Sequence, residues 1–273
     1  MNRRLAVTAA VLVWVALGAL AGEPSCPRLE GHWGWGGSYA VGTGGRFGIF
    51  ASGATLVLVD FPGGSELREL GLGRVDGWPT DFVISGATAY VSVQSYGLEI
   101  FDLGHTGGPS LLGPWGSTES PRALAVDSEH AFVADGVGLR VLDVSEPRRP
   151  IEVAALDLGY EGGGYDVELN GHYAFVAAGY DLVVVDIQVP EDPFVVARMA
   201  LDGYYPLLAL DDATVWLAGG EPDLVAVDVS EPLLPHRVGG LNLPGIEWDL
   251  DAADGLVYVA AGPTGLQVID GSD

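Results

Sequence analysis

One short string recurs six times along this chain at almost constant spacing. Each copy is a mostly apolar run that begins with leucine and ends in an aspartate, and the six aspartates are Asp60, Asp102, Asp143, Asp186, Asp228 and Asp270. Successive aspartates lie 42, 41, 43, 42 and 42 residues apart. Spacing of this kind is typical of repeat architectures, in which each repeat is one small structural unit that stacks on the next.

A second string precedes the first in each repeat. It joins an aromatic residue to a β-branched or aliphatic one, as in Tyr90-Val91, Phe132-Val133 and Phe175-Val176. Such residues favour β-strands. Pairs such as Asn170-Gly171 and Asp254-Gly255 stand just before these strands and have the chemistry of tight hairpin turns. Each repeat therefore contains at least one predicted β-hairpin.

Two more strands complete the repeat. An apolar segment lies before each hairpin turn, as at residues 123–126, and another follows a proline-containing loop, as at residues 151–156. Four antiparallel strands in about 42 residues match one blade of a β-propeller. The sequence predicts an all-β, six-bladed β-propeller of four-stranded antiparallel blades, with an open β-solenoid as the alternative.

The two ends of the chain favour the closed ring. Residues 143–150 and 228–235 form similar loops with the pattern Asp-Val-Ser-Glu-Pro followed by a second proline. Residues 23–27 resemble the second half of that loop, and residues 270–273 resemble its first half. We expect residues 28–33 to supply the outermost strand of the last blade, beside residues 266–270. A ring closed in this way has no free end blades.

The first residues predict export. Arg3 and Arg4 precede an apolar run that ends in Ala19-Leu20-Ala21, the pattern of a cleaved secretory signal. The expected domains are a signal peptide at 1–21 and a single propeller at 22–273, located in the periplasm, outside the cell or at its surface. An uncleaved membrane anchor is the alternative, whereas cleavage leaves no membrane span. Cys26 is the only cysteine, so no internal disulfide is expected.

The charge of the chain excludes some partners. It contains 37 acidic residues, no lysine and 12 arginines, and its formal net charge is −25. Nucleic acid and anionic membranes need basic patches, so neither is an expected partner. We expect a monomer that binds an extracytoplasmic protein or carbohydrate.

Several strings resemble one known family. They are Gly138-Leu139-Arg140-Val141-Leu142-Asp143-Val144-Ser145-Glu146-Pro147, Asp181-Leu182-Val183-Val184-Val185-Asp186, Ala174-Phe175-Val176-Ala177 and Tyr258-Val259-Ala260-Ala261. They are similar to the repeat of the LVIVD family of bacterial exported propellers, and the resemblance extends over essentially the whole chain after the signal. It implies a propeller fold and a module of cell-surface proteins, and it supplies no catalytic residues. The loops at 61–64 and 103–106 depart from the family pattern.

Aromatic residues mark the loops that lead into the innermost strands. These candidate ligand-binding residues are Trp35, Trp78, Trp115, Tyr165, Tyr205 and Trp248, with Tyr204 beside Tyr205 and acidic residues such as Asp76 and Glu247 close by. Aromatic rings beside carboxylates suit sugars and cationic groups through stacking and cation–π attraction. The alternative is that these rings pack between blades as part of the core.

Three aspartates occupy equivalent places at the start of alternate innermost strands. Asp81, Asp166 and Asp249 belong to the second, fourth and sixth repeats, and three carboxylates around a channel could hold a hard cation such as Ca²⁺. The alternative is that each accepts hydrogen bonds from nearby backbone. In the same way, Asp143 and Asp228 are expected to cap their own turns.

No catalytic signature accompanies these residues. The sequence has no nucleophile elbow, phosphate-binding Walker loop, dinucleotide fingerprint or zinc-spaced histidine pair. The preferred function is a non-catalytic extracytoplasmic module that binds a protein or carbohydrate and needs no cofactor. The alternative is a metal-dependent enzyme of the hydrolase or lyase type, with its site at the central channel.

Overall fold

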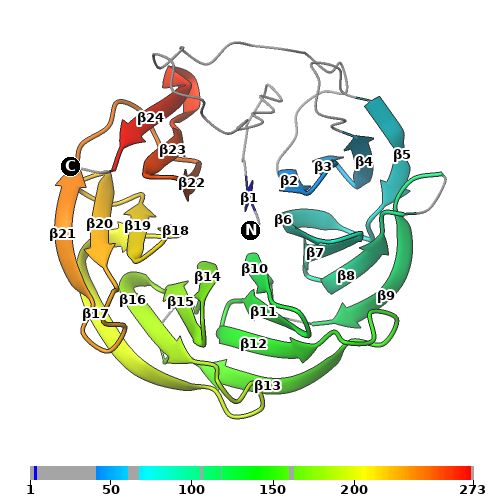
Figure 1. The fold of residues 1–273 in the computed structure, drawn as a ribbon, viewed down its shortest axis with the longest axis horizontal. Coiled ribbons are helices and arrows are strands. Elements are labelled where there is room, and N and C mark those ends of the chain that lie inside the picture. Colours follow the sequence, from blue (N-terminus) through cyan, green and yellow to red (C-terminus); the bar gives the residue numbers. More distant parts are fainter. Residues whose placement is uncertain are drawn as a thin grey trace.

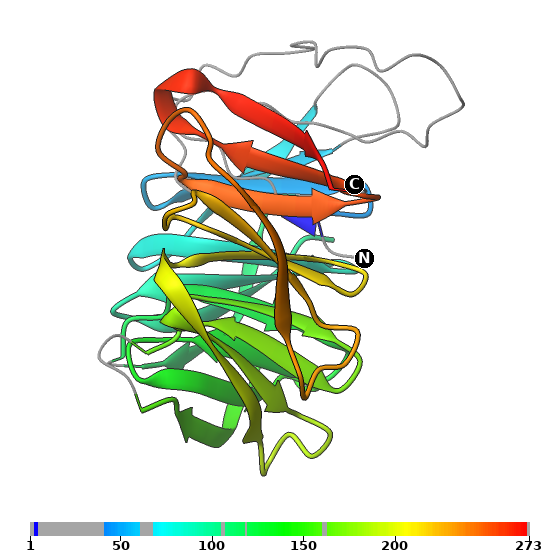
Figure 2. The ribbon, with the colours of Figure 1, turned by 90° about the vertical axis from the view of Figure 1, so that its left-hand side faces the viewer.

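The described part of the chain forms a ring of six antiparallel sheets. The computed structural model describes residues 41–60, 68–104, 107–117, 119–159 and 163–271, together with the backbone of the two-residue strand β1 (Arg3–Arg4). The sheets stand around a common axis as the blades of a propeller (Figure 1). Seen edge-on, the strands run between the two faces of the ring (Figure 2). The predicted six-bladed β-propeller is confirmed.

Strand order within a blade follows the chain from the centre outwards. The innermost strands are β2 (Val41–Gly44), β6 (Trp78–Ser85), β10 (Ala123–Val126), β14 (Asp166–Asn170), β18 (Leu207–Asp211) and β22 (Asp249–Ala253). The second strands are β3 (Phe47–Ser52), β7 (Thr88–Gln94), β11 (His130–Ala134), β15 (Tyr173–Ala177), β19 (Thr214–Ala218) and β23 (Leu256–Ala260).

The third strands carry the repeated aspartate. They are β4 (Thr55–Asp60), β8 (Gly97–Asp102), β12 (Gly138–Asp143), β16 (Gly179–Asp186), β20 (Leu224–Asp228) and β24 (Leu266–Asp270). The outermost strands are β5 (Arg68–Arg74), β9 (Ser110–Gly116), β13 (Ile151–Asp157), β17 (Phe194–Tyr205) and β21 (His236–Leu241). A single 3₁₀ turn, η1 (Gly262–Thr264), lies between β23 and β24, and β1 pairs with β2.

Local sequence sets the turns within a blade. Asp254 and Gly255 connect β22 to β23 with φ of 57° and 78°, which is the positive-φ pair that a type I′ hairpin turn requires. The aspartate at the end of the third strand caps the following loop, because Asp143 Oδ1 accepts the amide of Ser145 at 2.9 Å and Asp228 Oδ1 accepts that of Ser230 at 2.7 Å. The predicted turn-capping role of these aspartates is confirmed.

The outer half of the blade carries an irregularity that recurs. The pairing of the third strand with the fourth shifts register between Leu58 and Val59 in the first blade, and an equivalent shift occurs in the next four blades. A shift of this kind is a β-bulge, which bends the strand and increases its twist.

The hydrophobic core lies between the blades. Phe132 and Val141 of the third blade pack with Val176 and Val183 of the fourth, and all four side chains are fully buried. The other large clusters likewise combine residues of two neighbouring blades. Burying each large apolar side chain contributes about 1.5–3 kcal/mol, so much of the stabilisation depends on neighbouring blades.

Two inner carboxylates connect adjacent blades. Asp81 Oδ2 on β6 accepts the amide of Leu124 on β10 at 2.8 Å, and Asp166 Oδ2 on β14 accepts the amide of Leu208 on β18 at 3.0 Å. The other oxygen of each carboxylate accepts the amide of the next residue in its own strand. Each aspartate therefore satisfies one backbone donor in its own blade and one in the next.

Replacing one of these carboxylates by an amide tests this role. We expect Asp166→Asn to lower the free energy of unfolding by about 1–3 kcal/mol, because one of the two buried amides loses its acceptor. Thermal unfolding followed by circular dichroism measures the effect. Asp192→Asn, in an exposed loop, is the matched control and should leave the melting temperature unchanged. Equal melting temperatures for the two variants would contradict the inter-blade role.

Blade six leaves an edge that no described strand covers. β24 pairs with β23, and the described residues place no strand on its outer side. Val268 is 43% exposed, whereas Val141 and Val184, which hold the same position in the third and fourth blades, are fully buried. The expected partner, residues 28–33, lies outside the described residues, so closure of the ring by this segment stays a prediction.

A proline in the expected closing strand tests ring closure. In the chain from residue 22 onward, we expect Leu29→Pro to lower the melting temperature and to speed amide exchange in β24, because proline cannot donate to the strand ladder. Ser25→Pro, upstream of the expected strand, is the control. Unchanged exchange in β24 would show that this segment does not pair there.

Candidate functional site

Two sets of loops lie on one face of the ring. Because neighbouring strands are antiparallel, the connection into each innermost strand and the loop between the second and third strands lie at the same end of a blade. The turns between the first and second strands and the proline-containing loops lie at the other end. We call the first side the aromatic face and the second the opposite face.

The predicted aromatic residues divide into exposed and buried ones. Trp78 and Trp248 are 47% and 46% exposed, and Tyr165 is partly exposed. Trp115 is partly buried against the core between the second and third blades. Trp35 lies outside the described residues.

Tyr205 was predicted to bind ligand, but the structure buries it. Its side chain is fully buried, its ring lies against the backbone of Gly220, and its hydroxyl donates to the carbonyl of Pro222 at 2.9 Å. The structure thus makes Tyr205 a core residue, in agreement with the alternative that these rings pack between blades. Its neighbour Tyr204 is the exposed ring at this position.

Two further exposed rings were not among the predicted residues. Tyr96 lies in the connection between β7 and β8, Tyr180 is the second residue of β16, and both are more than half exposed. Tyr96 lies over the backbone of Gly77, directly beside Trp78 in the chain. The alternating strand direction could have indicated these rings, because it brings both loop sets to the same face.

Three tyrosines of the fourth blade form one cluster. The ring of Tyr204 meets the ring of Tyr165 edge-on at 5.3 Å between centroids, and that of Tyr180 at 5.5 Å. The Arg122 guanidinium lies 4.0 Å from the Tyr165 centroid, and its Nη1 donates to the carbonyl of Gly164 at 3.1 Å. Burial and the hydrogen bond with Tyr165 raise the pKa of Tyr204 above its usual value, so this hydroxyl stays protonated. The cluster therefore joins the fourth blade to Arg122, which directly precedes β10 of the third blade.

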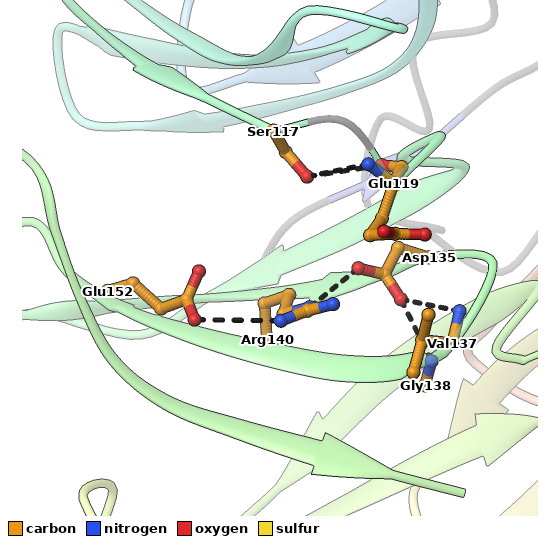
Figure 3. A network of polar contacts seen from close by, with 7 residues as sticks. All are labelled: Ser117, Glu119, Asp135, Val137, Gly138, Arg140 and Glu152. Atoms are coloured by element: carbon orange, nitrogen blue, oxygen red, sulfur yellow. Dashed lines mark hydrogen bonds and ion pairs between the residues drawn. The ribbon is translucent and has the colours of Figure 1, made fainter. Parts of the chain in front are cut away.

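Arginine neutralises the carboxylates of the third blade. Asp135 is buried, and its Oδ1 accepts the amides of Val137 and Gly138, each at 2.8 Å (Figure 3). Its Oδ2 accepts Nε of Arg140 at 2.7 Å, and Arg140 Nη1 lies 3.6 Å from Glu152 Oε1. Burial opposes the charge of Arg140, but the attraction of Asp135 and Glu152 raises its pKa overall. On the same face, the amide of Glu119 donates to Ser117 Oγ at 3.1 Å (Figure 3).

The three predicted metal ligands bind backbone amides. Asp81, Asp166 and Asp249 lie at the inner ends of the second, fourth and sixth blades, and each accepts the amide of the residue that follows it. Within the described ranges, no three Asp, Glu, His or Cys side chains gather in a group that could hold a metal ion. A cation site in the channel therefore stays a prediction, while the structure gives two of these aspartates an inter-blade role.

Within the part of the chain that the structure describes, no helix has the length and apolar character needed to cross a membrane.

The exposed rings and carboxylates of the aromatic face can stack on planar or apolar groups and can attract cations.

Comparison with known proteins agrees with the repeat. The LVIVD repeat family matches at residues 120–157 and 161–199, which correspond closely to the third blade (β10 to β13) and the fourth (β14 to β17). The match is narrower than the predicted resemblance, which extended over essentially the whole chain after the signal. Among curated proteins, none matches this sequence significantly.

Solved structures share the fold at low sequence identity. The β-propeller domain of Myceliophteria thermophila Cps50 (Swd1) is 11% identical, with a TM-score of 0.67 over 83% of this chain and 80% of that chain. A functionally unknown protein from Desulfotomaculum acetoxidans DSM 771 is 10% identical, with a TM-score of 0.65 over 79% and 72%. The computationally designed Ika8 protein is 13% identical, with a TM-score of 0.63 over 85% and 70%.

At such identities the likeness shows the fold alone. The family match adds the identity of the repeat, and its bounds agree with those of the third and fourth blades. The chain therefore contains LVIVD repeats, in its third and fourth blades, within the fold of a six-bladed β-propeller.

Proposed function

We propose that the protein is a non-catalytic, exported binding module that captures a protein or carbohydrate ligand on its aromatic face. The observation that carries this proposal is the set of large exposed rings on the loops and strand ends of that one face. They are Trp78, Tyr96, Tyr180, Tyr204 and Trp248. Export rests on the signal-like sequence of residues 1–21.

Exposed aromatic side chains on rigid loops favour binding. Large exposed apolar groups that gather on one face of a soluble protein tend to mark an interaction surface. Trp and Tyr dominate binding energies because a large ring buries much area and loses little conformational freedom. Their supports here are fixed: Tyr204 meets two other rings, and the amide of Trp248 donates to Ala260 at 2.8 Å. Binding would then require little reorganisation.

The opposite face also exposes apolar side chains and so provides an internal control. Leu233 and Leu234 lie in the loop between β20 and β21 and are the most exposed of the large leucines on that side. Their loop belongs to the proline-containing pattern that the sequence repeats. We assign it a structural role in the blade, and we expect it to contribute nothing to ligand capture.

Selection of ligands followed by paired substitutions tests the proposal. Binders for the chain from residue 22 onward are selected from a phage-displayed peptide library and from an array of immobilised oligosaccharides. We expect Trp78→Ala combined with Trp248→Ala to weaken the selected ligands about 30-fold, corresponding to roughly 2 kcal/mol for lost aromatic anchors. Calorimetry measures the dissociation constants.

The control pair is Leu233→Ala with Leu234→Ala, which should change affinity less than twofold. Melting temperatures of both variants should match that of the unsubstituted protein. Equal losses for the two pairs, or unfolding of the tryptophan pair, would reject the aromatic face as the binding surface.

A further inference from the structure

Comparison of equivalent positions in the fourth and fifth blades shows that one ion pair of the fourth blade has no counterpart in the fifth. Asp181 and Asp223 hold the same place in the repeat, since each directly precedes the first leucine of its third strand. Asp181 Oδ2 accepts Nη1 of Arg198 at 3.0 Å. Arg198 stands opposite Val183 in the ladder, and the residue in the same position on β21 is Gly240. The fifth blade therefore keeps the carboxylate and lacks the arginine.

The nearest described guanidinium, that of Arg237, lies against Gly240 but forms no ion pair with Asp223. Asp223 Oδ2 accepts the amide of Leu243 at 2.6 Å, and no described arginine or histidine forms an ion pair with Asp223 or Glu247. Arg237, on the same blade, lies 3.7 Å from Asp202 and donates to the carbonyl of Gly239. Asp223 and Glu247 thus differ from Asp135 and Asp181, each of which pairs with an arginine.

Glu247 is a second carboxylate that forms no ion pair with a described residue. Its Oε1 is buried, and within the described part of the chain it has no hydrogen-bond partner. Burial and the nearby charge of Asp223 raise the pKa of Glu247 above its usual value. A buried acceptor without a donor is a costly arrangement that an incoming N–H group would relieve.

An exposed ring belongs to the residue that follows Glu247. Trp248 follows Glu247 in the chain, and its indole lies against Gly262, so close that a Cβ at that glycine would be 3.3 Å from the ring. Ile246, on the other side of Glu247, is also exposed. Carboxylates, an indole face and an aliphatic side chain together complement a long cationic side chain, whose stem is apolar and whose head group is charged.

We propose that the ligand of the aromatic face is a basic polypeptide segment, and that one of its arginine or lysine side chains binds between Asp223 and Glu247 against the ring of Trp248. The inference rests on the proposed binding function and adds the chemical class of the ligand. The cation of the ligand takes the part that Arg198 plays for Asp181 in the neighbouring blade.

Charge complementarity favours this occupant over a neutral sugar. The chain has a formal net charge of −25, so its field attracts basic partners and speeds their association. A sugar hydroxyl could donate to Glu247 but would leave the paired negative charges uncompensated. A basic peptide supplies both the hydrogen-bond donor and the positive charge.

Three labelled peptides test the inference by fluorescence anisotropy. The first alternates arginine with glycine, the second replaces each arginine by neutral citrulline, and the third replaces each arginine by glutamate. We expect the arginine peptide to bind at least about tenfold more tightly than the citrulline peptide, and the glutamate peptide not to bind. Asp223→Asn combined with Glu247→Gln should weaken the arginine peptide about tenfold.

A variant with the same change in net charge separates a site from general attraction. Glu191→Gln combined with Glu231→Gln removes two exposed carboxylates from the opposite face and should change the affinity less than twofold. Trp248→Ala should weaken the arginine peptide as well. Equal losses for the two charge-neutralising pairs, or equal affinities for the arginine and citrulline peptides, would overturn the cationic subsite.

Failure here is distinguishable from failure of the proposed function. If peptides selected by phage display lose affinity in the tryptophan variant but show no preference for basic residues, the aromatic face binds ligands and the cationic subsite is wrong. If neither peptides nor oligosaccharides bind, the proposed function itself is wrong.

Discussion

A blade of four short strands cannot bury both of its faces by itself. The large apolar clusters of this protein accordingly draw on two adjacent blades each, as when Phe132 of the third blade packs with Val176 of the fourth. Each blade depends on its neighbours for part of its core, so stability accumulates around the ring. The carboxylates of Asp81 and Asp166 follow the same rule, because each satisfies an amide in the next blade as well as one in its own.

The dependence of each blade on its neighbours determines where changes in sequence are tolerated. The strands repeat because each must present the same apolar surface to the next blade, whereas the loops of the aromatic face are free to differ. Blade four carries Arg198 beside its third-strand aspartate, and blade five has Gly240 at the same position. Equivalent positions of a nearly symmetric ring thus carry different side chains on one face, and the proposed cationic subsite depends on this difference.

Local chemistry was predictable from the sequence, but burial was not. The turn at Asp254-Gly255 and the capping by Asp143 follow from residues close in the chain, so the sequence predicted them correctly. Tyr204 and Tyr205 are adjacent in the chain, yet one ring is exposed and the other is fully buried. Their difference depends on what the neighbouring loop places beside them, such as Gly220 against Tyr205, and no local pattern shows that.

The sequence by itself determined the number of blades, the strand order and the residues that cap each turn, because these depend on regular spacing and on short-range hydrogen bonds. Only the tertiary structure decided which aromatic rings face solvent and that Asp81 joins two blades. It also decided which carboxylates have an arginine, because ion pairs form across strands whose side chains meet only after the sheet is built. Residues about 40 positions apart become neighbours through the ring, and their contacts depend on the geometry between blades.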